Sequence, residues 1–389
     1  MSDPIYLDGF STLPLAPEAQ TAMVSAWSKP GNAGSPNAAG ERAARMVADG
    51  RAAVAALIGA APDEIIFTSG ATEANNLALL GAARAIAREA PHRRRILLSA
   101  IEHKAVIEPV RQLEAEGFVA TIVPVTPNGV TDIAALRALA GNDIALGSIM
   151  LVNNELGTIQ PVAQAADIVH EAGGLVHCDA AQAVGKIPVN VIDLDIDYLS
   201  LSAHKCYGPM GIGALYVSAA AIRPDAQLFG GHQQGGLRSG TEPVPLIAGF
   251  GAAARLAEAS LAMDAEHGNG LLGLLLDEMR RAQLRFSIVS GDAERIAGGA
   301  AIAISDADGD ILSALLARTV AISTGSACTS GQIRTSHVLE AIGFPEKKAR
   351  SVIRLFCNRY TGEQEIRNAA EQIVEAVHRC GLATGDIRQ

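Results

Sequence analysis

Short apolar runs alternate with amphipathic stretches from about residue 60 to residue 220. Runs of this length, rich in Val, Ile and Leu, predict buried strands, and apolar residues at helical spacing between them predict helices. The expected strands are Ile65–Thr68, Ile96–Ser99, Ala120–Val123, Ile144–Val152, Leu175–Asp179, Tyr198–Ser202 and Gly213–Val217. The expected helices are Thr72–Arg88, His103–Glu116, Asp132–Leu139 and Val162–Ala172. This alternation predicts an α/β fold with a mostly parallel sheet covered on both faces.

The pattern changes after residue 243. An alanine-rich helical stretch from Pro243 to about Glu266 predicts a connector to a second, smaller α+β domain. Elements expected there are helices Leu271–Gln283, Ile311–Ala317 and Glu363–Cys380, with strands near Phe286–Ser290 and Ala300–Ile304. We therefore expect a large domain over residues 16–250. The small domain should combine 1–15 with 251–389 and carry a loop at about 323–335.

Composition agrees with this division, because 389 residues exceed one ordinary core and suit two domains. Hydrophobic residues make up 49 % and aromatic residues only 4 %, with 39 glycines, which is typical of a cytosolic α/β enzyme. The formal net charge of −10 argues against direct nucleic-acid binding. The one dense basic segment, His92–Arg95, is interpreted as a solvated turn.

The expected localisation follows from three absent signals. The chain has no apolar run of membrane length, and its start, Met1–Pro4, lacks a charged region followed by an apolar stretch. Its five cysteines are widely spaced, without Cys-x-x-Cys, which fits neither a disulfide framework nor a zinc site. We expect a cytoplasmic protein with reduced thiols and no membrane partner.

Lys205 is the first candidate for chemistry. It follows the apolar run Tyr198–Ser202, in a chain with only six lysines against 25 arginines. A buried ammonium is costly, and a lysine that loses its proton becomes a nucleophilic amine able to bind an aldehyde cofactor. Lys205 is therefore a candidate for a covalent link to pyridoxal phosphate (PLP). The alternative is a lysine that extends from the strand end to water.

Other candidates also follow strands, where ligands bind in parallel sheets. The small residues of Phe67–Glu73 can close backbone N–H groups on an anion, although Ser69 or Thr72 could equally cap the helix. Asp179 could keep a pyridine nitrogen protonated. His177 is interpreted as a packed histidine, since no further metal ligands are spaced to join it.

His103 and Cys328 complete the candidate set. His103 follows a third strand, where an imidazole can stack on a flat ring and move protons, the alternative being a structural histidine. Cys328 lies in the small-residue strip Ser323–Gly331, where a thiol can be exposed and reach another site. An incidental loop cysteine is the alternative there.

Seven segments together resemble one family. They are Thr-Ser-Gly-Ala-Thr-Glu at 68–73, Glu-His-Lys-Ala at 102–105, Val-Asn-Asn-Glu at 152–155, His-x-Asp-Ala-x-Gln at 177–182, Ser-Ala-His-Lys-x-Tyr-Gly-Pro at 202–209, Arg-Ser-Gly-Thr at 238–241 and Gly-Ser-Ala-Cys-Thr-Ser at 325–330. In this order and approximate spacing they resemble the NifS/IscS-type cysteine desulfurases. These are PLP-dependent enzymes of the class V aminotransferase family, with the aspartate aminotransferase-like fold.

The resemblance implies a role for each matching residue around the cofactor. Lys205 would link to PLP and later move the substrate Cα proton, while His103 would stack on the ring and shuttle protons. Asp179 would pair with the pyridine nitrogen and Gln182 with the phenolic oxygen. The phosphate would be held by Thr72, Ser202 and His204, and by Thr241 of a neighbouring subunit, which implies a homodimer.

The resemblance also implies the substrate and the reaction. Asn154 and Arg354 would hold the carboxylate of L-cysteine, to which a planar guanidinium is suited. Cys328 would take the sulfur as a persulfide, leaving L-alanine, and pass it to an acceptor such as an iron–sulfur scaffold or a tRNA-thiolation protein. Two alternatives stay open: a selenocysteine lyase or other class V enzyme that does not use Cys328, and a low-activity PLP-fold sulfur-transfer partner.

Four segments depart from the family pattern. Asn-x-Ala-Thr-Thr-Pro is replaced by residues 9–14, Gly-Phe-Ser-Thr-Leu-Pro, and the histidine of Asn-Pro-Ser-Ser-x-His by Asn37. Gly-Gly-Gly-Gln-Glu-Arg-Gly becomes Gly-Gly-His-Gln-Gln-Gly-Gly at 230–236, and the Phe-Ser after the arginine becomes Leu355-Phe356. We expect these changes at substrate entry and the subunit contact, where they would affect substrate preference and rate.

Overall fold

A seven-stranded sheet forms the larger part of the protein in the computed structural model, which describes residues 3–325 and 336–385. Its strand order is β2 (Ile65–Thr68), β8 (Gly213–Val217), β7 (Tyr198–Ser202), β6 (Leu175–Asp179), β5 (Ile144–Ser148), β3 (Arg95–Ser99) and β4 (Val119–Val123). Neighbouring strands are parallel except at β8, which is antiparallel to both β2 and β7. The predicted α/β fold with a mostly parallel sheet is confirmed, although β5 ends before the expected Val152.

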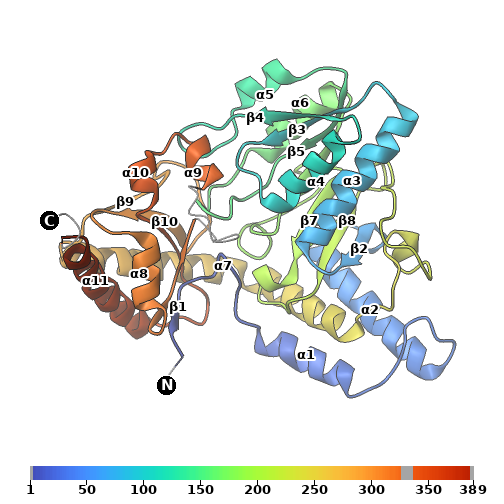
Figure 1. Ribbon diagram of the computed structural model, residues 1–389. Helices are drawn as coiled ribbons and strands as arrows, with labels where there is room; N and C mark the ends of the chain where they lie inside the picture. Colours follow the sequence, from blue (N-terminus) through green and yellow to red (C-terminus); the bar gives the residue numbers. More distant parts are fainter. Residues whose placement is uncertain (1–2, 326–335, 386–389) are drawn as a thin grey trace.

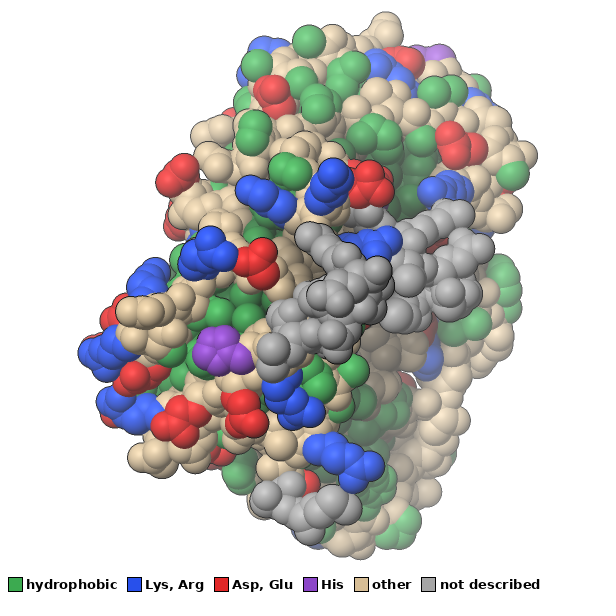
Figure 2. Space-filling model, turned by 60° about the vertical axis from the view of Figure 1, so that its left-hand side comes forward, with side chains coloured by type: hydrophobic (Ala, Val, Ile, Leu, Met, Phe, Trp, Pro, Cys, Tyr) green, Lys and Arg blue, Asp and Glu red, His purple; other side chains and the backbone are tan. Residues whose placement is uncertain are grey.

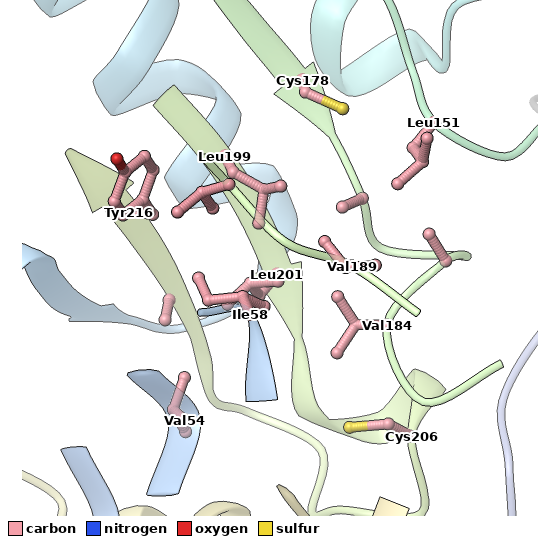
Figure 3. Close-up of a cluster of buried hydrophobic side chains, with 14 of the residues drawn as sticks. Val54, Ile58, Leu151, Cys178, Val184, Val189, Leu199, Leu201, Cys206 and Tyr216 are labelled. Atoms are coloured by element: carbon pink, nitrogen blue, oxygen red, sulfur yellow. The ribbon is translucent and has the colours of Figure 1, made fainter. Parts of the chain in front are cut away.

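Helices cover both faces of this sheet because alternate strand residues point to opposite sides. On one face, Tyr198 of β7 packs in a core with α3 (Ala71–Glu89) and α4 (Lys104–Glu114). On the other face, Leu199 and Leu201 pack in a core with α2 (Ala38–Leu57) and α6 (Val162–Glu171). Figure 3 shows part of this second core, in which side chains from α2, β7 and β8 meet. A short helix, α5 (Ile133–Leu139), follows β4.

The smaller unit is built on a four-stranded antiparallel sheet. Its order is β12 (Ser323–Thr324), β13 (Val352–Phe356), β10 (Gly299–Ile304) and β9 (Phe286–Ile288). Helices α8 (Gly309–Leu316) and α11 (Glu363–Gly385) pack on it, and α9 (His337–Ala341) and α10 (Glu346–Ala349) lie beside it (Figure 1). The N-terminal strand β1 (Ile5–Tyr6) pairs with β11 (Val320–Ala321), so the N-terminus joins this unit.

Helix α7 (Val244–Arg281) runs from one unit to the other (Figure 1). We expected two helices separated near residue 270, and this prediction is wrong. Gly268 lies in the unbroken helix because it packs against Gly298, where a Cβ would come within 3.2 Å of the Gly298 Cα. The predicted domain boundary at residue 250 falls inside α7 and stays a prediction.

Helix α7 is also the one helix of the described chain long and apolar enough to cross a membrane. Its buried residues belong to both cores: Phe250 packs with α2 and Leu275 with α11. Because α7 is an amphipathic helix that bridges two cores, its apolar composition is explained by burial in both.

On the face of the molecule that Figure 2 shows, basic and acidic side chains are interspersed.

The sequence patterns did not identify helix α1 (Pro17–Trp27) or helix α2. Both are rich in alanine, and both pack along α7. Without a strong apolar stripe, their position depends on this tertiary packing rather than on local periodicity.

Candidate active site

Lys205 lies at the carboxyl end of β7, in the short 3₁₀ helix Ala203–Lys205. Its Nζ donates to the carbonyl oxygens of Phe10 (2.5 Å) and Ser11 (2.7 Å). Burial, followed by the guanidinium charge of Arg354, lowers the pKa of Lys205 to about 8. No carboxylate of the described chain pairs with it. The side chain is half-buried and its amine is bonded to backbone carbonyls rather than extended to water, so that alternative is wrong.

Asp179 ends β6, beside Ser200 of β7. Its carboxylate is buried and accepts hydrogen bonds from Asn75 Nδ2 (2.8 Å) and the Ala181 N–H (2.9 Å). Within the described residues it has no cationic partner at ion-pair distance. A buried carboxylate without a counter-ion fits a ligand that brings a protonated nitrogen, such as the ring of PLP.

Gln182 lies one turn beyond Asp179 and points to the same segment as Lys205. Its Nε2 donates to the Phe10 carbonyl (2.8 Å), the same oxygen that accepts from Lys205. Its Oε1 accepts from Lys186 Nζ (3.3 Å). The fold therefore brings Lys205 and Gln182 to one carbonyl of the N-terminal segment.

His103 is the N-cap residue of α4, in the connection that follows β3. Its Nδ1 accepts the Ala105 N–H (3.1 Å), so a proton on the neutral ring resides on Nε2. Desolvation lowers the pKa of His103, helped by the positive charge of Lys205 and opposed by Asp179. The lowered pKa leaves the ring a neutral base at pH 7.

The start of α3 is suited to an anion. Gly70 is its N-cap, and no side chain of the described residues caps the helix, so the alternative of a Ser69 or Thr72 cap is wrong. The Ser69 N–H is taken by Glu73 (2.8 Å), which also pairs with Arg238 (2.9 Å). The remaining first-turn N–H groups of α3 have no partner within the helix and present a positive dipole end.

The other expected phosphate contacts lie around this helix start or at the surface. A Cβ on Gly70 would come within 4.0 Å of Ser202 Oγ, so β7 ends beside α3. Thr72 and Thr241 are exposed. His204 Nδ1 contacts Thr12 Oγ1 (3.0 Å), and burial lowers the pKa of His204 to about 4, which leaves the ring neutral at pH 7.

Arg354, on β13 of the smaller unit, also belongs to the candidate site. Its side chain is buried, and Nη1 donates to the Asn154 carbonyl (3.0 Å). Nε and Nη2 donate to Ser323 Oγ (3.0 and 2.8 Å). All these acceptors are neutral, and no described carboxylate lies at ion-pair distance. A buried guanidinium without a counter-ion can accept a substrate carboxylate through a bidentate pair.

Cys328 lies outside the described residues, so its position relative to this site stays a prediction. His177 is fully buried between Ser148 Oγ (2.9 Å) and Ser200 Oγ (3.0 Å), which confirms its interpretation as a packed histidine. The sequence patterns missed two contributors, Asn75 and Lys186. The rarity of lysine could have indicated Lys186, whereas no local signal distinguishes Asn75.

Comparison with known proteins agrees with this geometry. The model of the family described as "Aminotransferase class-V" matches residues 5–368. The chain belongs to the class-V aminotransferase family. A cysteine desulfurase IscS from Vibrio campbellii is 41 % identical over 383 residues, covering 97 % of this chain and 93 % of that protein. A cysteine desulfurase IscS from Rickettsia bellii is 40 % identical over 380 residues, covering 97 % and 92 %.

Solved structures extend the likeness. A NifS-like protein superimposes with a TM-score of 0.88 at 33 % identity, covering 96 % of this chain and 99 % of the other. DndA from Streptomyces lividans superimposes with a TM-score of 0.75 at 36 % identity, covering 92 % and 99 %. A structure titled "SspA in complex with cysteine" has a TM-score of 0.80 at 32 % identity, covering 92 % and 100 %. Class-V enzymes of this kind depend on PLP, which the residues around Lys205 and Asp179 fit.

Two departures from the family pattern pack against one another in the structure. A Cβ on Gly9 would come within 2.3 Å of Phe356 Cδ1, so the small residue and the large ring compensate one another. Phe10 packs edge-on to Phe356 at 5.5 Å between ring centroids, and both are buried. The carbonyl oxygens of Phe10 and Ser11 in this segment contact Lys205, and the expected effect of these departures on substrate entry and the subunit contact stays a prediction.

In the other two departures, the described contacts also give residues a structural role. Asn37 is the N-cap of α2 and accepts from the N–H groups of Ala39 (3.1 Å) and Gly40 (3.0 Å). Gln234 is buried and its Oε1 accepts from the Phe67 N–H of β2 (2.9 Å). Near it, Phe229 is 86 % exposed, on the surface where we expect the subunit contact.

Proposed function

We propose that this protein is a PLP-dependent cysteine desulfurase, which converts L-cysteine to L-alanine and transfers the sulfur to Cys328 as a persulfide. The observation that carries the proposal is the half-buried amine of Lys205, held by two carbonyl oxygens in a site where Asp179 and Arg354 have no ion-pair partner among the described residues. Family membership and the two desulfurase relatives support it.

Each site residue has a task that its surroundings permit. Lys205, with its pKa lowered to about 8, binds the cofactor and moves the proton of the substrate Cα. Asp179 balances a protonated ring nitrogen, and Gln182 donates to the phenolic oxygen. The N-terminus of α3, with Thr72, Ser202 and His204, binds the phosphate. When bound, PLP supplies an electron sink for the carbon atoms of the substrate.

Residues of both units would bind the substrate. Arg354 and Asn154 orient the carboxylate of L-cysteine, and the neutral ring of His103 exchanges protons with the reacting groups. The Cys328 thiolate forms a bond to the substrate sulfur while the bond from Cβ to sulfur breaks. The electron pair of that bond stays on the substrate carbon, which takes up a proton and becomes the methyl group of alanine.

We further propose that the protein is a cytoplasmic homodimer in which Thr241 completes the partner's phosphate site, and that an acceptor protein such as an iron–sulfur scaffold takes the sulfur. Exposure of Thr241 and Phe229 supports the dimer. The names of the IscS relatives support a sulfur-transfer pathway.

The test is incubation of the purified holoenzyme with L-cysteine and a thiol reductant, with alanine and sulfide measured. Wild type should release both. Lys205→Ala should lose the visible absorbance of the bound cofactor and all turnover, while Lys347→Ala, an exposed lysine of α10, should keep both. Cys328→Ser should keep the absorbance and lose persulfide formation. Alanine from selenocysteine alone, or amino transfer that depends on a keto acid, would instead identify another class-V activity.

A further inference from the structure

A second buried lysine, Lys186, adjoins the active site and has no task in the reaction described above. Its side chain is 8 % exposed. Its Nζ donates to Gln182 Oε1 (3.3 Å) and to the backbone carbonyl of Lys205 (2.9 Å). The ring of Phe356 lies 5.7 Å from the same atom, measured to the centroid. Both hydrogen bonds of this ammonium therefore end on active-site residues.

Keeping a cation at this position has a cost. Burial, followed by the positive charge of Lys205, lowers the pKa of Lys186 to about 7. Within the described chain no carboxylate lies at ion-pair distance from its Nζ. A position that needed only packing would be filled more favourably by an apolar side chain. Packing alone therefore does not account for a lysine at this position, whereas the hydrogen bonds that it donates can.

The geometry bears directly on the orientation of the Gln182 amide. An amide has an acceptor end and a donor end, whereas an ammonium can only donate. The protonated Lys186 on one side and the Phe10 carbonyl on the other, 2.8 Å from Nε2, together place Oε1 towards the lysine and Nε2 towards the carbonyl. That carbonyl is also the acceptor for Lys205 Nζ, so the donor end of the amide faces the reactive amine.

We propose that Lys186 is a positioning residue, which donates to Gln182 Oε1 and so holds the amide N–H group ready for the phenolic oxygen of PLP. The inference rests on the proposed function, because it concerns the cofactor contact assigned to Gln182. An N–H donor at that oxygen stabilises its ionised form, so loss of the donor makes the oxygen hold a proton more strongly.

The experiment is a spectroscopic pH titration of the resting holoenzyme, without substrate, in a double-mutant cycle. Lys186→Met, which keeps the length and removes the donor, should raise the apparent pKa of the bound chromophore by about one pH unit, the equivalent of one hydrogen bond to a charged group. Gln182→Met should raise it by a similar amount. The double variant should shift it no further than either single variant, because both remove the same contact. Lys347→Met is the matched control and should titrate as wild type does.

An unshifted titration in Lys186→Met would overturn the proposal, as would shifts of the two single variants that add in the double variant. Lys186→Gln provides a second test that does not depend on tolerance of the Met variant. It keeps a donor for Gln182 without the charge and should titrate within about 0.3 units of wild type. A shift in Lys186→Gln would show that the charge acts, against the proposal. Failure of the proposed function is separate, since wild type itself would then lack the visible absorbance or release no alanine.

Discussion

Unpaired charges distinguish the active-site residues from the ordinary ion pairs of this protein. Arg359 pairs with Asp264 and Arg238 with Glu73, whereas Arg354 donates only to neutral oxygens. Such an arrangement leaves the charge available for a ligand, since a buried ion without a partner gains most from binding one. At the residue scale, Lys205, Asp179 and Arg354 are the ionic side chains of the candidate site, and none of them has an ion-pair partner among the described residues.

Substitution of Arg354 tests the assigned carboxylate contact. Arg354→Lys keeps the charge but removes the planar fork, so kcat/KM for L-cysteine should fall about 10- to 100-fold, mainly through KM. Steady-state alanine formation measures this. Arg367→Lys, on the outer helix α11, is the control and should leave KM unchanged. An unaltered KM in Arg354→Lys would remove the residue from substrate binding.

Contacts between elements explain why particular residues occupy positions for which the neighbouring sequence gives no reason. Lys205 on β7 reaches the carbonyl of Phe10, 195 positions earlier in the chain. Gly9 has room for no side chain because Phe356 of β13 occupies that space. The bridge between Asp8 and Phe356 fixes this register, so the N-terminal segment is held against β13 and beneath the site. A substitution in the N-terminal segment should therefore alter the packing of β13, and a substitution in β13 should alter that of the N-terminal segment.

The Gly9–Phe356 contact gives a prediction for stability. Gly9→Ala should lower the melting temperature by about 2–6 °C, because the new methyl group overlaps the ring. Phe356→Ser should also lower it, through the cavity left behind. The double variant should lose less than the sum of the two, since the smaller side chain makes room for the methyl group. Thermal unfolding of the four proteins measures the coupling, and simple additivity would contradict it.

Across the whole molecule, buried histidines link stability to pH. Burial lowers the pKa of His177 from 6.5 to about 4, so the unfolded chain binds this proton more readily than the folded one. The stability due to neutral His177 is complete above pH 6.5 and is lost as the pH falls towards 4. His170 has the opposite sign, because its hydrogen bonds to Asp197 and Asp195 raise its pKa.

This linkage predicts how substitution of each histidine changes the dependence of the melting temperature on pH. The melting temperature of His177→Gln should decline less than that of wild type between pH 6.5 and about 4. His170→Gln is the matched control and should decline more steeply than wild type, because it loses a group that stabilises the folded state at low pH. Parallel curves for wild type and His177→Gln would contradict the assignment of a neutral buried imidazole.

Local pattern was sufficient for the strands of the large sheet and for the residue types that carry the chemistry. Apolar alternation identified β2, β6, β7 and β8 to the residue, and Lys205, Asp179 and His103 were found because each follows a strand. These features depend on neighbours within a few positions, which the sequence displays directly. The seven family segments then indicated the cofactor and the reaction.

Only the tertiary structure decided which groups meet. It showed that Arg354 has no counter-ion among the described residues, that α7 is continuous through Gly268, and that Lys186 donates a hydrogen bond to Gln182. It also gave the departures at Gly9, Asn37 and Phe356 roles in packing and helix capping. The physical reason is that burial, partner identity and close approach are set by atoms far apart along the chain, and no local pattern records them.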